Sequence, residues 1–381
     1  MSTPRNTSPA LIPLTDLRAS HEACRGDWER RLDQVFSRSQ WILGPEVAAF
    51  EQEFAAFCGA PVCIGVGTGT DALSLALRLS GIVSPSQHVI TTPFTAPFTA
   101  LAILAAGARP AFADIDEETL LLDPAEAAAQ FTGRTAGFLP VHLYGQTCDL
   151  LQWSGLAGST GCVLIQDACQ AHGARHAGRP LTDYSPLVAY SFYPTKNLGA
   201  LGDGGALCTV GQEMAARACL LRDGGRDREH SSAVPGINSR LDEIQASYLR
   251  VALDRLAQWN DSRRRLAALY DEELADLPAD SFRPVGRDPQ ADHVFHLYVA
   301  RAARRNELQE HLAAHGVGSG IHYRTPLHLQ PAFAEFGAGE GSLPVAEKAA
   351  REVISLPMGP YLKEDEVRRI ADLIRRFYRG C

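Results

Sequence analysis

The chain has 381 residues, of which 45% are apolar and 21% charged, and its formal net charge is −8. This length predicts about two or three domains. The negative charge disfavours a nucleic-acid partner, because binding a phosphate backbone needs a basic face. No apolar run reaches about 18 residues, so we expect no membrane span. Nine cysteines without a Cys-x-x-Cys spacing favour reduced thiols in a cytoplasmic protein over a disulfide framework or a metal site.

The beginning of the chain predicts an irregular segment followed by two helices. Residues 1–20 have no regular pattern, and we place an N-terminal arm at 1–25. We expect a helix around 26–37 and another around 45–57, where Pro45 occupies the first helical turn.

Between residues 62 and 210, short β-rich runs alternate with amphipathic segments. Such alternation predicts a mostly parallel sheet with helices on both faces. Asp123, as an N-cap, and Pro124, at the first helical position, mark the start of one of these helices. The expected strands are 62–66, 88–92, 110–114, 135–141 and 162–167; the expected helices are 70–80, 97–106, 124–131 and 149–157; two runs at 187–192 and 205–209 can complete the sheet.

The pattern changes in the C-terminal part. We expect no helix between residue 180 and a long helical stretch, rich in Leu, Ala and Arg, at about 240–275. After it we expect a strand at 293–300, a His- and Pro-rich loop at 321–331, and helices at 304–314, 344–353 and 363–377. The fold class is therefore α/β, with a large domain at 26–250 and a smaller C-terminal α/β domain at 251–381.

One lysine differs from the other basic residues, which are almost all arginine. The three lysines are Lys196, Lys348 and Lys363. Lys348 and Lys363 lie among charged helical neighbours, which is typical of a solvated helix face. Lys196 follows an apolar run and precedes several glycines that let the backbone approach a ligand closely. Because lysine, unlike arginine, can lose its proton and form an imine, Lys196 is a candidate reactive group; a surface-loop lysine is the alternative.

Two further segments place polar groups at the carboxyl ends of expected strands. In 65–73, Gly-Val-Gly-Thr-Gly-Thr-Asp-Ala-Leu, a β-run ends in a glycine-rich turn and a helix begins. Free N–H groups and the positive end of a helix dipole there can cradle a phosphate; a plain helix-start turn is the alternative. Asp167 ends the run 162–167, where a buried carboxylate is costly unless it is paired; a helix N-cap is the alternative.

A cradle, a strand-end carboxylate and a reactive lysine are together what a phosphorylated pyridine aldehyde needs. The lysine forms an imine, the acid keeps the pyridine nitrogen protonated so that the ring acts as an electron sink, and the cradle fixes the phosphate. The combination is much more specific than any of its parts.

The chain resembles the DegT/DnrJ/EryC1/StrS family of sugar aminotransferases over nearly its whole length. The resemblance is carried by GPEVAAFEQEFAAFCGA near the start, GTGTDAL, PVHLYGQ, QDACQAHGA, SFYPTKNLGALGDGGA, GINSRLDEIQA and HYRTPLH. It implies the aspartate aminotransferase-like (type I) fold. It also implies pyridoxal 5'-phosphate as cofactor, with pyridoxamine 5'-phosphate between two half-reactions.

The resemblance also implies a role for each matching residue. Lys196 would be the Schiff-base lysine and proton shuttle, and Asp167 would pair with the pyridinium nitrogen. Gln170 would contact the 3-hydroxyl side of the ring. The residues implied at the phosphate are Gly69, Thr70, the backbone of Asp71, and Ser191.

Other matching positions lie near the substrate or the neighbouring subunit. Asn238 matches a position that reaches the phosphate of the neighbouring subunit, which implies a homodimer with a shared site. The positions that match substrate-proximal residues are Arg240, His322, Tyr323 and His328; interface or loop packing is the alternative for each.

Two segments depart from the family pattern. Many members have an aromatic residue that stacks on the cofactor ring, but Ala96 occupies that position here, so that the ring packs against a smaller group or Phe94 or Phe98 takes its place. Relatives often have Gly-Asp-Ala before the lysine strand, where this chain has Tyr184-Ser-Pro-Leu. Both departures bear on substrate preference and leave the class of chemistry unchanged.

The lysine segment is most similar to members acting on dTDP-3-keto-6-deoxyhexoses, with L-glutamate as the amino donor. A 4-keto or UDP-linked sugar is the main alternative, and L-glutamine is the alternative donor. A cofactor-binding regulatory or sensor protein without turnover, and a non-enzymatic α/β domain, are alternatives of other classes. Relatives that catalyse dehydration lack the lysine, so Lys196 favours transamination.

Overall fold

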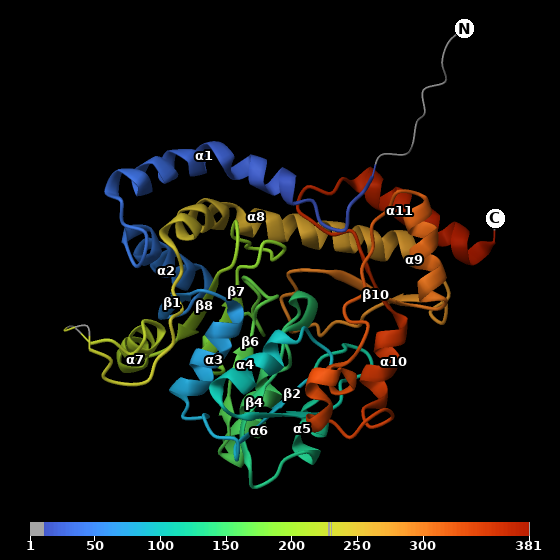
Figure 1. The fold of residues 1–381 in the computed structure, drawn as a ribbon. Helices are drawn as coiled ribbons and strands as arrows, with labels where there is room; N and C mark the ends of the chain where they lie inside the picture. The colour runs from blue at the N-terminus through green and yellow to red at the C-terminus, as the bar shows by residue number, and fades with distance from the viewer. Residues whose placement is uncertain (1–10, 228, 230, 381) are drawn as a thin grey trace.

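A central β-sheet with helices on both faces forms the larger part of the computed structural model, which describes residues 11–227, 229 and 231–380 (Figure 1). Hydrogen-bonded ladders give the strand orders β1-β8-β7-β6 and β3-β2-β4-β5. The strands are β1 (Val62–Val66), β2 (His88–Thr91), β3 (Arg109–Phe112), β4 (Thr135–Leu139), β5 (Val163–Leu164), β6 (Gln166–Asp167), β7 (Leu187–Ser191) and β8 (Gly205–Thr209).

The two ladders are continuous, because β5 and β6 are separated only by Ile165. The Ile165 amide donates to the Phe138 carbonyl at 2.9 Å, and the Asp167 amide donates to the Pro140 carbonyl at 3.0 Å. The pairs β2–β3, β2–β4, β4–β5 and β6–β7 are parallel, whereas β8 is antiparallel to β1 and to β7. The prediction of a mostly parallel sheet is confirmed, and the single expected strand at 162–167 is two short strands.

Alternate residues of the strands face two different cores. On β7, Val188 and Tyr190 pack with α2 (Pro45–Cys58) and the long helix α8 (Glu243–Leu274), while Leu187 and Ala189 pack with α3 (Gly69–Leu79) and α4 (Phe98–Ala106). The period of two along each strand therefore separates the two helical layers. Two more helices of the expected alternation, α5 (Pro124–Ala129) and α6 (Leu150–Thr160), pack against the other half of the sheet.

Two helices differ from the prediction. Helix α1 spans Leu17–Arg38 and begins nearer the N-terminus than expected, with the Asp16 carboxylate capping the Arg18 amide at 2.9 Å. The irregular arm is therefore shorter than predicted, and its residues 1–10 lie outside the described residues. Helix α7 (Gln212–Arg222) was not predicted; its small residues Ala215 and Ala218 pack against the sheet.

The C-terminal part is a small antiparallel sheet with its own helices. The strands β9 (Phe282–Pro284), β10 (Tyr298–Ala302) and β11 (Val353–Leu356) pair in the order β11-β10-β9. The prediction of a strand at 293–300 was wrong in its first half, because Phe295 has φ +44°, a value incompatible with extended backbone. The helices α9 (Arg305–Ala314), α10 (Pro344–Glu352) and α11 (Glu364–Arg379) are close to expectation. The expected loop at 321–331 contains the short 3₁₀ helix Leu327–Leu329.

Helix α8 connects the two parts of the molecule. It has 32 residues and passes the expected boundary at residue 250 without a break. Its first half lies beside α1 and α2, and its second half contacts α11 (Figure 1). Both parts of the chain therefore share this helix.

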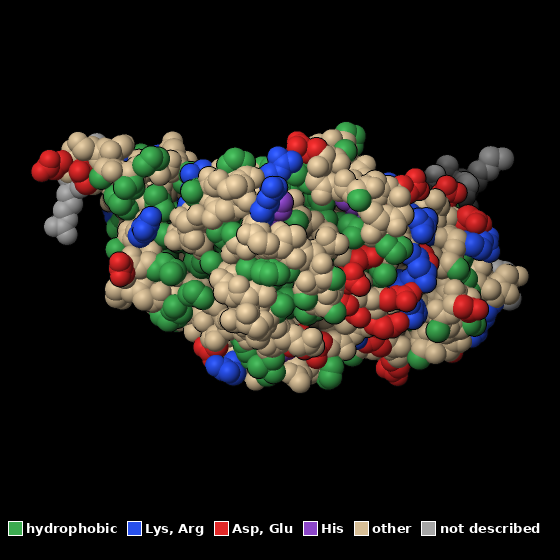
Figure 2. Space-filling model, turned by 90° about the horizontal axis from the view of Figure 1, so that it is seen from below, with side chains coloured by type: hydrophobic (Ala, Val, Ile, Leu, Met, Phe, Trp, Pro, Cys, Tyr) green, Lys and Arg blue, Asp and Glu red, His purple; other side chains and the backbone are tan. Residues whose placement is uncertain are grey.

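Charged groups on the surface are largely interleaved. On the face seen from below, most charged side chains lie toward one end of the molecule (Figure 2). Lys and Arg side chains lie there beside Asp and Glu side chains. Arg301 pairs with Glu352 at 2.6 Å within the C-terminal part, and Lys348 pairs with Glu117 of the larger part at 2.8 Å. Among the described residues, no helix has the length and apolarity needed to cross a membrane.

A buried carboxylate joins α8 to α2, and its removal is expected to destabilise the fold. Glu243 is 0% exposed and accepts hydrogen bonds from the amides of Gly44, Glu46 and Val47 at 2.9, 3.0 and 2.8 Å. Because Glu243→Ala leaves these amides unsatisfied at a helix N-terminus, we expect a loss of about 2–3 kcal/mol of unfolding free energy. Thermal and denaturant unfolding measure this loss. Glu335→Ala, which removes the partner of Arg109 in an exposed ion pair, should change stability by less than about 0.5 kcal/mol; equal effects of both substitutions would contradict the prediction.

Candidate active site

Lys196 lies in a tight turn between β7 and β8, at the carboxyl end of β7. Its amide donates to the Tyr193 carbonyl at 2.8 Å, and the Ala200 amide closes the loop on the Phe192 carbonyl at 2.7 Å. The side chain is half-buried, unlike the exposed Lys348 and Lys363. Burial lowers the pKa of the Lys196 ammonium below its usual 10.5, although Cys169 and Asp167 nearby favour the charged form. This amine therefore loses its proton more readily than a solvated lysine does.

Asp167 ends β6 and is only 3% exposed. Its Oδ2 accepts from the Thr99 hydroxyl at 2.8 Å, and its Oδ1 accepts from the Cys169 amide at 3.1 Å. The residues that follow form a turn, so Asp167 is not the N-cap of a helix. The structure thus places a buried, hydrogen-bonded carboxylate close enough to Lys196 to influence its pKa. Thr99, on α4, was not identified from the sequence.

The expected phosphate cradle is the N-terminus of α3. Thr68 is the N-cap, and its Oγ1 accepts from the Asp71 amide at 3.0 Å. In the described part of the chain, the amides of Gly69 and Thr70 have no acceptor. The donors available to an anion are therefore these two amides, whereas the Asp71 amide already has a partner.

Glycines bring three segments together at this cradle. A Cβ at Gly69 would lie 2.6 Å from the Ser191 Cβ and 2.9 Å from the Cys169 Sγ. A Cβ at Gly205 would lie 2.4 Å from the Thr68 carbonyl oxygen. Only glycine fits at either position, and Ser191 thereby lies beside Gly69. A free-amide cradle, a buried carboxylate and a half-buried amine at one edge of the sheet fit a phosphorylated pyridine aldehyde.

Gln170 links the site to the C-terminal part. Its Oε1 accepts from the Tyr144 amide at 2.8 Å, and its Nε2 donates to the Tyr323 hydroxyl at 3.2 Å. The Tyr323 ring is edge-on to Phe94 at 6.3 Å. Phe94 is fully buried, whereas Phe98 is 58% exposed. Of the two aromatic residues considered as replacements for Ala96, Phe94 is therefore the one that packs beside a site residue.

Three histidines lie close enough to Lys196 for its charge to lower their pKa, and burial favours their neutral form. His322 Nδ1 forms a hydrogen bond with the Ser355 hydroxyl at 2.8 Å. Burial, and to a lesser extent the charge of Lys196, lowers the pKa of His322 to about 4. Burial and Lys196 likewise lower the pKa of His172 to about 3 and that of His296 well below its usual value. His172 and His296 were not identified from the sequence, because they are distant in the chain and lie in no motif with Lys196.

The segment that contains Asn238 contacts the cradle from the same chain. The Ser239 hydroxyl accepts from the Gly67 amide at 2.9 Å and donates to the Asp71 carboxylate at 2.7 Å. Asn238 is exposed, and its side chain makes no hydrogen bond with the described residues. Arg240 is half-buried and pairs with Asp223 at 2.7 Å.

His328, which the resemblance places near the substrate, does not point toward Lys196. His328 is 1% exposed, and its Nε2 lies 3.1 Å from Glu347 Oε1 on α10. Glu347 also accepts from the Gly341 amide at 2.8 Å. The structure therefore places His328 in the packing of the C-terminal part and does not bring it to Lys196.

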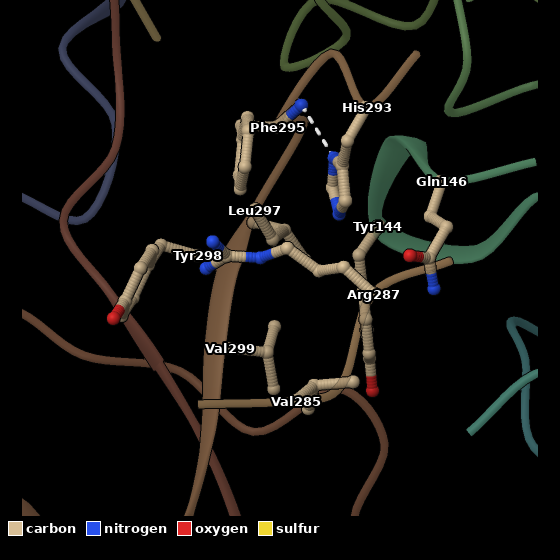
Figure 3. Close-up of a pocket in the computed structure, with 9 residues that line it drawn as sticks. All are labelled: Tyr144, Gln146, Val285, Arg287, His293, Phe295, Leu297, Tyr298 and Val299. Carbon is tan, nitrogen blue, oxygen red and sulfur yellow. Dashed lines mark hydrogen bonds between the residues drawn. The ribbon is translucent and has the colours of Figure 1, made fainter. Parts of the chain in front are cut away.

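A small pocket lies on the other side of Tyr144 (Figure 3). Arg287 crosses it, with its guanidinium 4.8 Å from the Phe295 ring and 5.7 Å from the Tyr298 ring, and pairs with Asp271 at 2.5 Å. The Phe295 amide donates to His293 Nδ1 at 2.9 Å. Tyr144 forms part of the wall of this pocket. Because the Arg287 guanidinium is already paired with Asp271, it is not a free catalytic group.

Known proteins resemble this chain along its whole length. The model of the DegT/DnrJ/EryC1/StrS aminotransferase family matches residues 24–375. The dTDP-3-amino-3,4,6-trideoxy-alpha-D-glucose transaminase of Streptomyces venezuelae is 43% identical over 96% of this chain and 96% of its own. The UDP-N-acetyl-3-dehydro-alpha-D-glucosamine 3-aminotransferase of Acidithiobacillus ferrooxidans is 38% identical over 98% of this chain and 100% of its own. The sensory transduction protein EryC1 of Saccharopolyspora erythraea is 44% identical over 93% of this chain and 96% of its own.

Solved structures agree with the observed fold. The crystal structure of DesV from S. venezuelae superposes with a TM-score of 0.93 at 42% identity, covering 97% of this chain and 99% of that one. A Bacillus subtilis relative at 26% identity, with a TM-score of 0.86 over 98% of this chain and 87% of that one, was solved with bound PMP. These matches cover the sheet, the lysine turn and the C-terminal part alike. The chain is an aminotransferase of the DegT/DnrJ/EryC1/StrS family.

Proposed function

We propose that this aminotransferase transfers an amino group from L-glutamate to a dTDP-linked 3-keto-6-deoxyhexose, with pyridoxal phosphate as cofactor. The observation that carries the proposal is the convergence of Lys196, Asp167 and the free amides of Gly69 and Thr70 at one edge of the sheet. The product would be an amino sugar for the biosynthesis of a glycan, antibiotic or lipopolysaccharide.

Each residue of the site has a definite chemical task. When bound, pyridoxal phosphate supplies an electron sink for the bonds at the donor's α-carbon. Lys196 would hold the cofactor covalently and would carry a proton to and from the reacting carbon; burial lowers the pKa of its ammonium, which makes the neutral amine more available for this task. Asp167, which accepts from the Thr99 hydroxyl, would pair with the ring nitrogen. Gly69, Thr70 and Ser191 would hold the phosphate.

Neutral groups of the C-terminal part face the substrate. His322 stays uncharged above its pKa of about 4, so it can exchange hydrogen bonds with sugar hydroxyls without attracting the diphosphate. Tyr323, assigned to the sugar, accepts a hydrogen bond from Gln170, which is assigned to the cofactor ring. This hydrogen bond connects the two proposed binding regions. Arg240 is the cationic candidate for contact with a substrate anion, and it would have to share its charge with Asp223.

The names of relatives support a ketone at C3 of the sugar more strongly than they support dTDP as the attached nucleotide. Relatives from S. venezuelae and Aneurinibacillus thermoaerophilus are named for dTDP-3-amino sugars. Relatives from A. ferrooxidans and Pseudomonas aeruginosa are named for UDP sugars with a 3-dehydro or 3-oxo group. All these names place the reacting carbon at C3, which disfavours the 4-keto alternative, and the UDP-linked sugar remains the second candidate.

A regulatory role without turnover is the alternative from another class. It is favoured by the names of two relatives, the sensory transduction protein EryC1 and a pleiotropic regulatory protein of Geobacillus stearothermophilus. The two hypotheses differ in whether the bound cofactor reacts with an amino donor.

The purified protein is expected to show the near-visible absorbance band of lysine-bound cofactor, and L-glutamate should convert this band to that of the aminated cofactor. A dTDP-3-keto-6-deoxyhexose should then restore it faster than the UDP-linked or 4-keto analogue. Lys196→Ala should lack the starting band. A band that ignores every amino donor would favour the regulatory role, and no band after addition of pyridoxal phosphate would overturn the cofactor assignment.

Thr99→Val is expected to weaken cofactor binding. The substitution keeps the volume but removes the hydroxyl that donates to Asp167 Oδ2, which leaves a buried carboxylate oxygen without that donor. A loss of about 1–2 kcal/mol corresponds to a roughly 5- to 30-fold rise in the Kd of pyridoxal phosphate. Titration of the apoenzyme by absorbance measures it. Thr99→Ser, which keeps the hydroxyl, is the matched control, and an unchanged Kd in Thr99→Val would show that this hydrogen bond does not support the cofactor.

A site shared between subunits predicts complementation. If Asn238 reaches the partner's phosphate, a dimer of one Lys196→Ala and one Asn238→Ala subunit contains one site with both native residues. Refolding an equal mixture should restore about a quarter of the native sites, since half of the dimers are mixed. Activity and cofactor content are measured against each variant alone. If Asn238 acts within its own chain, or the protein is monomeric, the mixture will show only the average of the two variants.

A further inference from the structure

Helix α8 passes directly behind the lysine turn and buries two polar side chains there. Asn260 is 3% exposed and Arg263 is 4% exposed. Arg263 lines the same pocket as Lys196 and Asn197. Buried polar groups need partners, and the partners of these two residues lie in segments on either side of the active site.

Asn260 bridges the lysine turn and the segment that follows Asp167. Its Nδ2 donates to the His172 carbonyl at 2.9 Å, and its Oδ1 accepts from Asn197 Nδ2 at 2.9 Å. A backbone carbonyl only accepts, so the amide orientation of Asn260 is determined by His172 and leaves Oδ1 for Asn197. Asn197 directly follows Lys196, and His172 follows Gln170 by two residues. One side chain therefore contacts both segments that carry the reacting groups.

The lysine turn and α8 both hold the segment before β10. Asn197 Nδ2 donates a second hydrogen bond to the Val294 carbonyl at 2.8 Å. Arg263 Nη1 donates to the Phe295 carbonyl at 3.1 Å. These hydrogen bonds hold the residues directly before His296, whose pKa is lowered by burial and by the charge of Lys196. The polar face of α8 thus contacts the lysine turn, the Asp167 segment and the C-terminal part.

A glycine permits this contact. Gly173 has φ +83°, and a Cβ there would lie 2.9 Å from the Phe57 ring and 3.2 Å from Asn260 Nδ2. The chain after His172 therefore turns beside α8 only because no side chain intervenes.

We propose that Asn260 is a positioning residue that fixes Lys196 relative to Asp167, an inference that rests on the roles proposed above for those two residues. An amide suits this task because it offers a donor and an acceptor at once. Asp at position 260 would have no donor for the His172 carbonyl, and Ala would lose both hydrogen bonds. Proton transfer by Lys196 requires its amine within hydrogen-bond reach of the reacting carbon, so a small displacement of the turn reduces turnover more than binding.

The test compares Asn260→Ala and Asn260→Asp with a control on the same helix. Ser247 is 0% exposed and accepts from Trp28 Nε1 at 3.1 Å, so Ser247→Ala removes a buried polar contact of α8 away from the site. In the holoenzyme, the Asn260 variants should keep the cofactor band but lose about 10- to 100-fold in kcat, with little change in the KM for L-glutamate. The pH at which the band titrates should also shift. Ser247→Ala should lose thermal stability without changing kcat or this titration.

A second substitution keeps the proposal testable if Asn260→Ala does not fold. Asn197→Ala removes the hydrogen bond between Asn197 and Asn260, whereas Asn260→Asp removes the one to the His172 carbonyl. The two effects on kcat should not add, because the bridge through Asn260 needs both hydrogen bonds and is lost with either. An unchanged kcat and band titration in the Asn260 variants, or losses that follow melting temperature alike in the Ser247 and Asn260 variants, would overturn the proposal. A band that persists in Lys196→Ala would instead overturn the assignment of the lysine, and this inference with it.

Discussion

The structure depends on keeping a charged carboxylate in the interior of the protein. Asp167 is 3% exposed, and a carboxylate without partners in such a place costs several kcal/mol. The chain compensates with the Thr99 hydroxyl and the Cys169 amide, and it places the Lys196 amine nearby. These donors come from α4, from the turn after β6 and from the turn after β7. Only a parallel arrangement of β6 and β7 brings the last two to the same edge of the sheet.

The same edge of the sheet depends on two glycines for its close packing. Gly69 and Gly205 allow β8, the Ser191 segment and α3 to approach until a single Cβ would overlap. This close approach leaves the Gly69 and Thr70 amides at the carboxyl end of the sheet with no acceptor among the described residues. The proposed phosphate site is thus formed mainly by backbone, and N–H groups together with the helix dipole would favour an anion there. Thr68 and Ser239 stabilise the loop by satisfying the Asp71 amide and the Asp71 carboxylate.

Much of the sheet could be predicted because its signals are local. Each strand from β1 to β4 is a short apolar run next to a helical pattern, and its bounds differ from expectation by at most two residues. The three chemical groups were recognisable for the same reason, since each lies at the end of such a run. Helix α7 was missed because it follows two consecutive strands, where the alternation had apparently ended. The short strands β9 and β11 depend on pairing with residues of β10 that are 16 to 20 and 52 to 58 positions away in the chain, and such partners leave no local pattern.

The site beyond these groups was less predictable, because its members meet only through tertiary packing. His172 and His296 lie near Lys196 from segments on both sides of α8, and no spacing in the sequence relates them. His328 is a different case. Its motif places it near substrate residues, but its side chain turns toward Glu347 and the Gly341 turn. Sequence motifs locate a loop, whereas the direction of each side chain follows from which buried acceptors lie within reach.

Helix α8 determines how far the two parts of the molecule can move independently. A boundary at residue 250 would allow a hinge there, but a continuous helix resists bending because each turn is held by backbone hydrogen bonds. Along this helix, Ser247 contacts Trp28 and Asn260 contacts the lysine turn. Further along, Arg263 contacts the segment before β10, and Tyr270 donates to the Pro357 carbonyl. The distances between those contacts are therefore set by the helical rise. The turn that carries Lys196 and the segment that follows Asp167 are therefore both held by one side chain of a continuous helix, which fixes their separation without any contribution from a bound ligand.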